Sequence, residues 1–123
     1  MKTIMFVILV SFAFIPAIAQ QTHFKWKGTL NLDSPTDIIL DFTNDICDAI
    51  RIADSQSLET MHYTLSDTLL TLQKITGGSE CDSSSIGKYK IEKKDDGLHI
   101  TLISDDCEDR SNALDNTIWT KEE

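Results

Sequence analysis

The candidate catalytic or metal-binding residues of this chain include three histidines, His23, His62 and His99. They show no metal-ligand spacing, and they fall at polar or mixed positions of strand-like segments, which indicates surface or rim side chains. The chain has no H-E-x-x-H, G-x-S-x-G, phosphate-loop or dinucleotide-binding motif. We therefore predict no catalytic residue, no metal site and no cofactor, and a protein that is not an enzyme.

A run of acids near the C-terminus could offer oxygen ligands to calcium. It consists of Asp105, Asp106, Glu108 and Asp109. These acids lack the alternating ligand pattern and the glycine of a dedicated calcium-binding loop. We interpret the run as a solvated loop.

Cysteine is present in an odd number, as Cys47, Cys81 and Cys107, for which one disulfide and one remaining thiol is the simplest arrangement. Three pairings are possible. We favour Cys81 with Cys107, because both lie in polar loops that flank a predicted hairpin. Cys47 lies in an apolar run, where we expect a small buried hydrophobic side chain; a reactive thiol or an intermolecular bridge is the alternative.

The first 19 residues have the organisation of a signal peptide. Lys2 supplies a positive charge, residues 4–15 are apolar, and Ala17-Ile18-Ala19 is an A-x-A cleavage site. An uncleaved anchor is the alternative, but the apolar stretch is shorter than the roughly 20 residues that a bilayer span requires. No cysteine follows the cleavage site directly, so there is no acceptor for a lipid anchor. We predict a secreted or periplasmic protein that begins at Gln20.

The remaining residues, 20–123, are enough for one domain with one core. No later segment is apolar and long enough to span a membrane, so we expect no membrane span after cleavage. The formal net charge of the whole chain is −9, which argues against nucleic acid or an anionic membrane surface as a partner. We interpret the acids as a solubilising surface and expect a monomer.

The elements that must position these residues are strands, because apolar and polar residues alternate along most of the domain. Segments with this alternation are residues 24–32, 38–42, 61–65, 70–72, 87–91 and 98–102, with a last apolar stretch at 118–119. Residues 46–53 suit either a strand or a short helix, and their β-branched isoleucines favour the strand. About eight short strands at this spacing are typical of an antiparallel barrel or sandwich.

Several of these segments resemble one known family. The motifs that carry the resemblance are Trp26-Lys27-Gly28, the hairpin of residues 63–72, Gly87-Lys88-Tyr89, and the ending with Cys107, Arg110 and Trp119. Together they resemble small exported bacterial lipocalin-like proteins of the calycin type. The resemblance implies an up-and-down antiparallel barrel of eight strands. It also implies that Trp26 and Arg110 pack together at the closed end, a contact of roughly 0.5 to 2 kcal/mol.

Two classes of function follow from such a barrel. The first is binding of a small apolar ligand, and the side chains that we predict to line its site are Trp26, Phe42, Tyr63, Leu70, Tyr89 and Ile100. The sequence leaves open whether these side chains line a cavity or fill the core. The second class is a protein-binding module, such as an inhibitor of an exported protease, that acts through residues 76–85 and 20–23.

Overall fold

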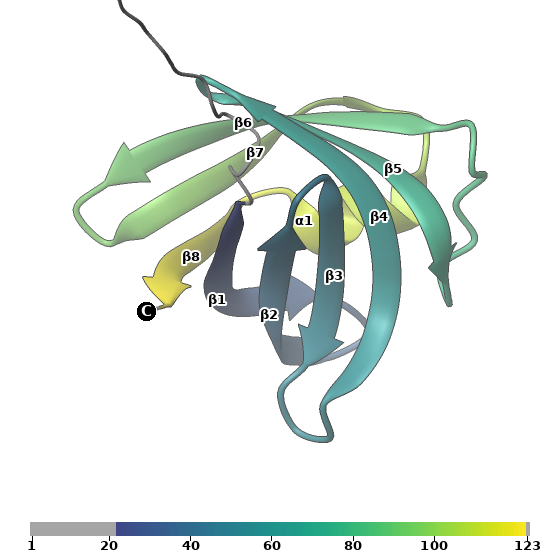
Figure 1. Ribbon diagram of the computed structural model, residues 1–123, viewed down its shortest axis with the longest axis horizontal. Helices are drawn as coiled ribbons and strands as arrows, with labels where there is room; N and C mark the ends of the chain where they lie inside the picture. The colour runs from purple at the N-terminus through teal and green to yellow at the C-terminus, as the bar shows by residue number, and fades with distance from the viewer. Residues whose placement is uncertain (1–21, 123) are drawn as a thin grey trace, which may run out of the picture.

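Eight antiparallel strands close into one barrel in the computed structural model, which describes residues 22–122 (Figure 1). In chain order the elements are β1 (His23–Asn31), β2 (Pro35–Thr43), β3 (Ile46–Arg51), β4 (Gln56–Ser66), β5 (Leu69–Gly77), β6 (Ile86–Lys94), β7 (Gly97–Asp105), α1 (Glu108–Leu114) and β8 (Thr117–Glu122). Each strand pairs with the next, and β1 pairs with β8. The predicted all-β barrel is confirmed, whereas the predicted signal peptide lies outside the described residues.

The strands follow from the alternation of the sequence. In β1, Trp26 and Leu30 are buried, while Lys27 and Thr29 between them are exposed. Residues 46–51 are strand β3, as their isoleucines indicated, with Cys47 buried. Tight two-residue turns join β2 to β3 and β4 to β5, and each begins with a residue at positive φ, Asn44 or Asp67, a residue type that tolerates this conformation.

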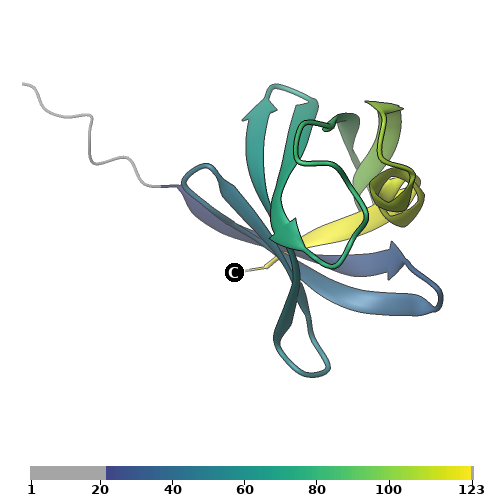
Figure 2. The ribbon, with the colours of Figure 1, turned by 90° about the vertical axis from the view of Figure 1, so that its right-hand side faces the viewer.

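Helix α1 completes the barrel wall where the strands do not reach one another. Strand β8 pairs only with residues 98–100 of β7 and 25–28 of β1. Beyond these residues α1 packs against β7 and β1, as Figure 2 shows with the helix seen nearly end-on. Asp115 at the end of the helix connects it to both strands. Its carboxylate accepts a hydrogen bond from the Leu102 N–H of β7 at 2.8 Å, and its carbonyl accepts one from the Asn31 side chain of β1 at 3.3 Å.

The acidic run is solvated as predicted at Asp106, Glu108 and Asp109, but it is not a loop throughout and Asp105 is buried. Glu108 and Asp109 form the first turn of α1, where carboxylates interact favourably with the helix dipole. Asp105 ends β7 with its side chain fully buried. The helix presents Arg110, Ala113 and Leu114 to the interior, a spacing that places all three on one helical face.

One end of the barrel carries the turns at residues 44–45 and 67–68, and we call it the turn end. Phe24, Trp26, Phe42 and Tyr63 form an aromatic cluster there, with the Phe24 and Phe42 rings stacked at 4.6 Å and Tyr63 edge-on to Phe42 at 4.8 Å. The opposite end, which we call the mouth end, is bordered by residues 32–34, 52–55 and 78–85 and by α1.

Replacement of Gly28 by alanine is expected to destabilise the barrel at the β1–β8 seam. Gly28 pairs with Trp119, and a Cβ atom at this position would lie 2.6 Å from the indole ring and 2.7 Å from the Ile118 carbonyl oxygen. Overpacking of this kind costs about 1 to 3 kcal/mol of unfolding free energy, which urea denaturation measures. Gly78→Ala is the matched control, since no atom lies within 4 Å of the added methyl group. Equal urea midpoints for the two variants would contradict this description of the seam.

Candidate ligand-binding site

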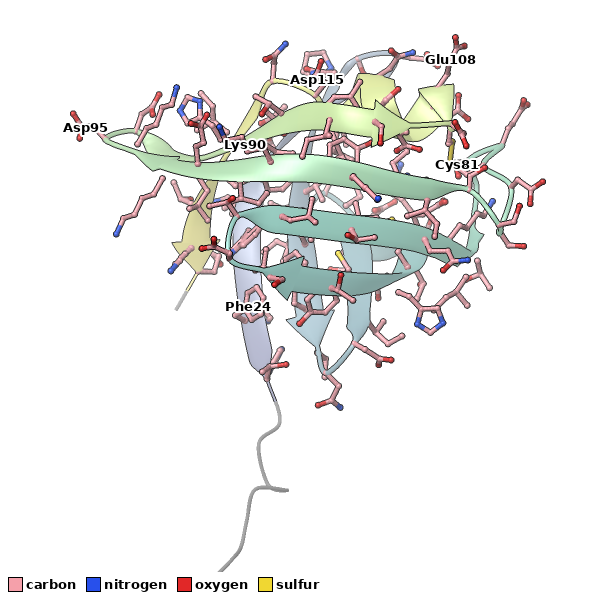
Figure 3. The ribbon with its side chains drawn as sticks, turned by 90° about the horizontal axis from the view of Figure 1, so that it is seen from above. Phe24, Cys81, Lys90, Asp95, Glu108 and Asp115 are labelled. Atoms are coloured by element: carbon pink, nitrogen blue, oxygen red, sulfur yellow. A yellow bond between two sulfur atoms is a disulfide. The ribbon has the colours of Figure 1, made fainter. Side chains whose placement is uncertain are left out.

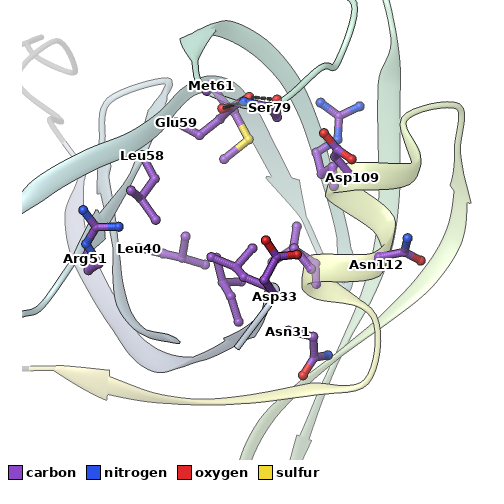
Figure 4. Close-up of a pocket in the computed structure, with 16 residues that line it drawn as sticks. Asn31, Asp33, Leu40, Arg51, Leu58, Glu59, Met61, Ser79, Asp109 and Asn112 are labelled. Carbon is purple, nitrogen blue, oxygen red and sulfur yellow. Dashed lines mark hydrogen bonds between the residues drawn. The ribbon is translucent and has the colours of Figure 1, made fainter. Parts of the chain in front are cut away.

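A cavity of about 700 Å³ opens at the mouth end, between the strand ends of β1 to β4 and helix α1 (Figure 4). Its apolar side chains are Leu30, Leu32, Leu40, Leu58, Met61, Ala113 and Leu114. Figure 4 shows Leu40, Leu58 and Met61 around the hollow, with Asp109 and Asn112 of α1 on its other side. The site therefore has a strand wall and a helix wall.

The strand wall is a consequence of the same alternation that builds the core. Leu30, Leu40 and Met61 occupy inward positions of β1, β2 and β4. They are inward residues on the mouth side of the aromatic cluster, and their side chains line the cavity. Leu58 continues the wall on β4 and is only partly buried. An apolar surface of this kind favours contact with an apolar ligand over contact with water.

A polar network holds the loop of residues 78–85 at the rim of the cavity. The Ser79 hydroxyl and N–H both donate hydrogen bonds to the Glu59 carboxylate, the N–H at 3.2 Å. The Lys74 ammonium donates to the Ser79 carbonyl at 2.6 Å and lies 4.0 Å from Glu59. The Glu59 and Lys74 side chains are only 13 % exposed, so this pair is well shielded from solvent. The network joins the loop to β4 and β5.

A buried ion pair fixes the helix wall. Arg110 of α1 donates two hydrogen bonds to Asp105, from Nε at 2.7 Å and from Nη2 at 2.8 Å, and Nη2 also donates to the Ser85 carbonyl at 3.1 Å. The Tyr89 hydroxyl donates to the same carboxylate. The two charged side chains are almost completely buried, at 4 % exposure for Arg110 and 0 % for Asp105. This pairing ties α1 to β6 and β7.

The ionisation of this group follows from its contacts. Burial by itself would raise the pKa of Asp105, but hydrogen bonds from Arg110, Tyr89 and the Cys107 N–H outweigh burial and hold the pKa of the carboxyl below its ordinary value. Burial, followed by the bond to Asp105, raises the pKa of the Tyr89 hydroxyl. Asp105 is thus charged and Tyr89 neutral at neutral pH.

The predicted disulfide between Cys81 and Cys107 is present and reinforces the mouth. It joins the loop of residues 78–85 to the residue that precedes α1. Figure 3 shows Cys81 and Glu108 at the same end of the molecule, with Asp95 at the opposite end. Cys47 forms no disulfide and is 1 % exposed; burial raises the pKa of its thiol, and the neighbouring Asp48 and Asp41 add to this effect. The reactive thiolate is therefore disfavoured at Cys47.

The six side chains that we predicted to line a ligand site all lie in the barrel interior. They are Trp26, Phe42, Tyr63, Leu70, Tyr89 and Ile100, and each is buried. None of them is among the described residues that line the mouth cavity; Tyr63 borders a separate depression of about 160 Å³ beside His62. Contact of these six with a ligand stays a prediction. Sequence reasoning passed over Leu30, Leu40, Leu58 and Met61, although the same alternation marks three of them as inward.

Trp26 and Arg110, for which the resemblance implies a mutual contact, have other neighbours. The Trp26 ring lies 4.7 Å from the Phe42 ring and 5.8 Å from the Phe24 ring, measured between centroids. Arg110 hydrogen-bonds Asp105 and Ser85. The tryptophan that packs over a glycine is Trp119, which covers Gly28. A Trp26–Arg110 pair stays a prediction.

The histidines are placed as single surface residues, each beside a carboxylate. The shortest of these contacts joins His99 Nε2 to Asp96 Oδ1 at 2.6 Å on the turn between β6 and β7. Hydrogen bonding to His99 lowers the pKa of Asp96. Over residues 22–122, no group of three or more histidine, cysteine or acidic side chains is arranged to hold a metal ion.

Comparison of the chain with family models, with curated proteins and with solved structures found no match. Within the part of the chain that the structure describes, no helix has the length and apolar character needed to cross a membrane.

Proposed function

We propose that the protein is an exported, lipocalin-like binding protein that holds a small apolar ligand in its mouth cavity and catalyses no reaction. The observation that carries this proposal is the cavity itself. Small-molecule sites in proteins are concave, largely apolar and about 300 to 1,000 Å³ in volume. A hollow of about 700 Å³ with seven apolar side chains on its walls has these properties. Export is supported by the signal-peptide pattern of residues 1–19.

The ligand in this proposal sits at the mouth, not deep in the barrel. The interior of an eight-stranded barrel is only just wide enough for side chains to fill it. Here Phe42, Leu70, Tyr89 and Ile100 are all completely buried and occupy that space. The proposal therefore modifies the expected lining: the aromatic residues form a floor beneath the site, and the leucines and Met61 form its walls.

Native mass spectrometry of the protein exported with its own signal peptide, without reducing agent, tests the proposal. We expect an additional mass that is lost on denaturation. The variant Leu58→Trp, which places an indole in the cavity, is expected to lower the occupancy about tenfold or more with little change in melting temperature. Ile75→Trp on the outer face of β5 is the matched control, because Ile75 is exposed and does not line the cavity.

Two results would contradict this assignment. One is a protein without bound mass that also shows no rise in melting temperature across a panel of apolar small molecules. The other is binding that Leu58→Trp and Ile75→Trp reduce equally, which would place the ligand outside the mouth cavity.

A further inference from the structure

The charges around the mouth cavity do not cancel, and the imbalance bears on the class of ligand. Five charged residues line the cavity, namely Asp33, Arg51, Glu59, Asp109 and Arg110. Both arginines are already paired. Arg110 is bonded to Asp105, and Arg51 donates to Asp54 from Nε at 3.0 Å and from Nη2 at 2.8 Å. Each guanidinium charge is therefore balanced by a carboxylate outside the lining, although the buried Nη1 of Arg110 has no hydrogen-bond partner among the described residues.

The three carboxylates that line the cavity differ in their partners. Glu59 has the Lys74 ammonium at 4.0 Å and the Ser79 hydroxyl as a donor. Asp109 accepts a single hydrogen bond, from the Glu80 N–H at 2.9 Å, and no cationic side chain among residues 22–122 forms an ion pair with it. Asp33 has neither a hydrogen-bond donor nor an ion-pair partner among those residues. Two uncompensated negative charges therefore remain at the mouth.

These two charges come from different elements. Asp33 lies in the turn between β1 and β2, Asp109 lies in the first turn of α1, and both line the cavity (Figure 4). Resting on the proposed function, we infer that the ligand is an amphipathic organic cation: an apolar body packs against Leu40, Leu58 and Met61, and an ammonium group lies near Asp33 and Asp109. The Coulomb attraction between unlike charges favours such a head group, and a carboxylate head would be repelled by the same side chains.

Three probes with the same alkyl chain separate the head group from the apolar body. They are decyltrimethylammonium, 1-decanol and decanoate, each titrated into the full protein by calorimetry at neutral pH and low salt. We expect the ammonium probe to bind about tenfold or more tightly than decanoate, with 1-decanol between them. Added salt should reduce the difference in affinity between the ammonium probe and decanoate, because the charges of the two acids are near the surface and are screened by salt. Equal or tighter binding of decanoate would overturn the inference.

The double variant Asp33→Asn/Asp109→Asn removes the two charges with little change of shape. We expect it to abolish the preference for the ammonium probe and to leave the affinity for 1-decanol unchanged. Asp67→Asn/Asp95→Asn, which removes two charges in turns at the other end of the barrel, is the matched control and should keep the preference. Loss of the preference in the control as well would contradict a local site, because overall charge would then explain it. Failure of all three probes to bind would refute the proposed function itself, whereas binding without discrimination would refute only the cationic ligand.

Discussion

Replacement of Arg110 by alanine is expected to lower the free energy of unfolding by about 3 to 5 kcal/mol, because it leaves a buried carboxylate without its partner. The Asp105 side chain is 0 % exposed and receives two hydrogen bonds from the Arg110 guanidinium, at 2.7 and 2.8 Å. Urea denaturation at neutral pH measures the effect. Arg51→Ala is the matched control: Arg51 makes the same two-bond contact with Asp54, but at the surface, so the urea midpoint should hardly change.

Acidification supplies a second readout of the same pair. The folded-state pKa of Asp105 is held below its ordinary value, so its contribution to stability is present above about pH 4 and is lost as the pH falls through the folded pKa. In Arg110→Ala the main opposing contact is gone, and burial should instead raise the pKa of Asp105. The difference in stability between the wild type and the variant should therefore shrink from about pH 7 to about pH 4. A constant difference over this range would contradict the role given to the ion pair.

Removal of the disulfide in Cys81→Ser/Cys107→Ser is expected to cost about 3 to 4 kcal/mol of unfolding free energy. The bridge spans a sequence separation of 26 residues, and closing a loop of this length restricts the unfolded chain by about that amount. Thermal unfolding with and without reducing agent measures the effect. Since the bridge joins two segments that line the cavity, we also expect weaker ligand binding in the variant at temperatures where it stays folded.

Cys47→Ala separates the disulfide from the third cysteine. Cys47 is buried and unbridged, so this variant should keep the large response to reducing agent that the wild type shows. Two results would contradict a stabilising role of the disulfide. One is a wild-type melting temperature that reducing agent leaves unchanged, and the other is a double serine variant with the same melting temperature as the wild type.

Much of the barrel could be predicted from the sequence, because strand period and turn chemistry are local properties. The alternation around Trp26 and the turn at Asn44-Asp45 each determine one element without reference to the rest of the chain. Helix α1 could not be predicted in this way. It is seven residues long and begins with two acids, and its stability comes from the burial of Arg110, Ala113 and Leu114 against strands distant in sequence.

The candidate site was harder to predict than the fold for a related reason. Alternation identifies which side chains point inward, but it does not say which of them meet another ring and which meet a hollow. Phe42 and Leu40 are both inward residues of β2; Phe42 packs in the aromatic cluster, while Leu40 faces the cavity. The difference depends on where α1 and the loop of residues 78–85 leave the barrel open, and that is a property of the assembled structure.

The most direct test of the proposed binding site uses the methyl group of Met61. Met61 lines the cavity and is the one methionine of the chain outside residues 1–19, so methyl labelling of methionine in the protein without those residues gives a single reporter. Titration with 1-decanol is expected to shift the Met61 methyl resonance until the site is saturated, and Leu58→Trp should suppress the shift. An unchanged Met61 resonance at concentrations where calorimetry detects binding, or the absence of any binding, would contradict a ligand site at the barrel mouth.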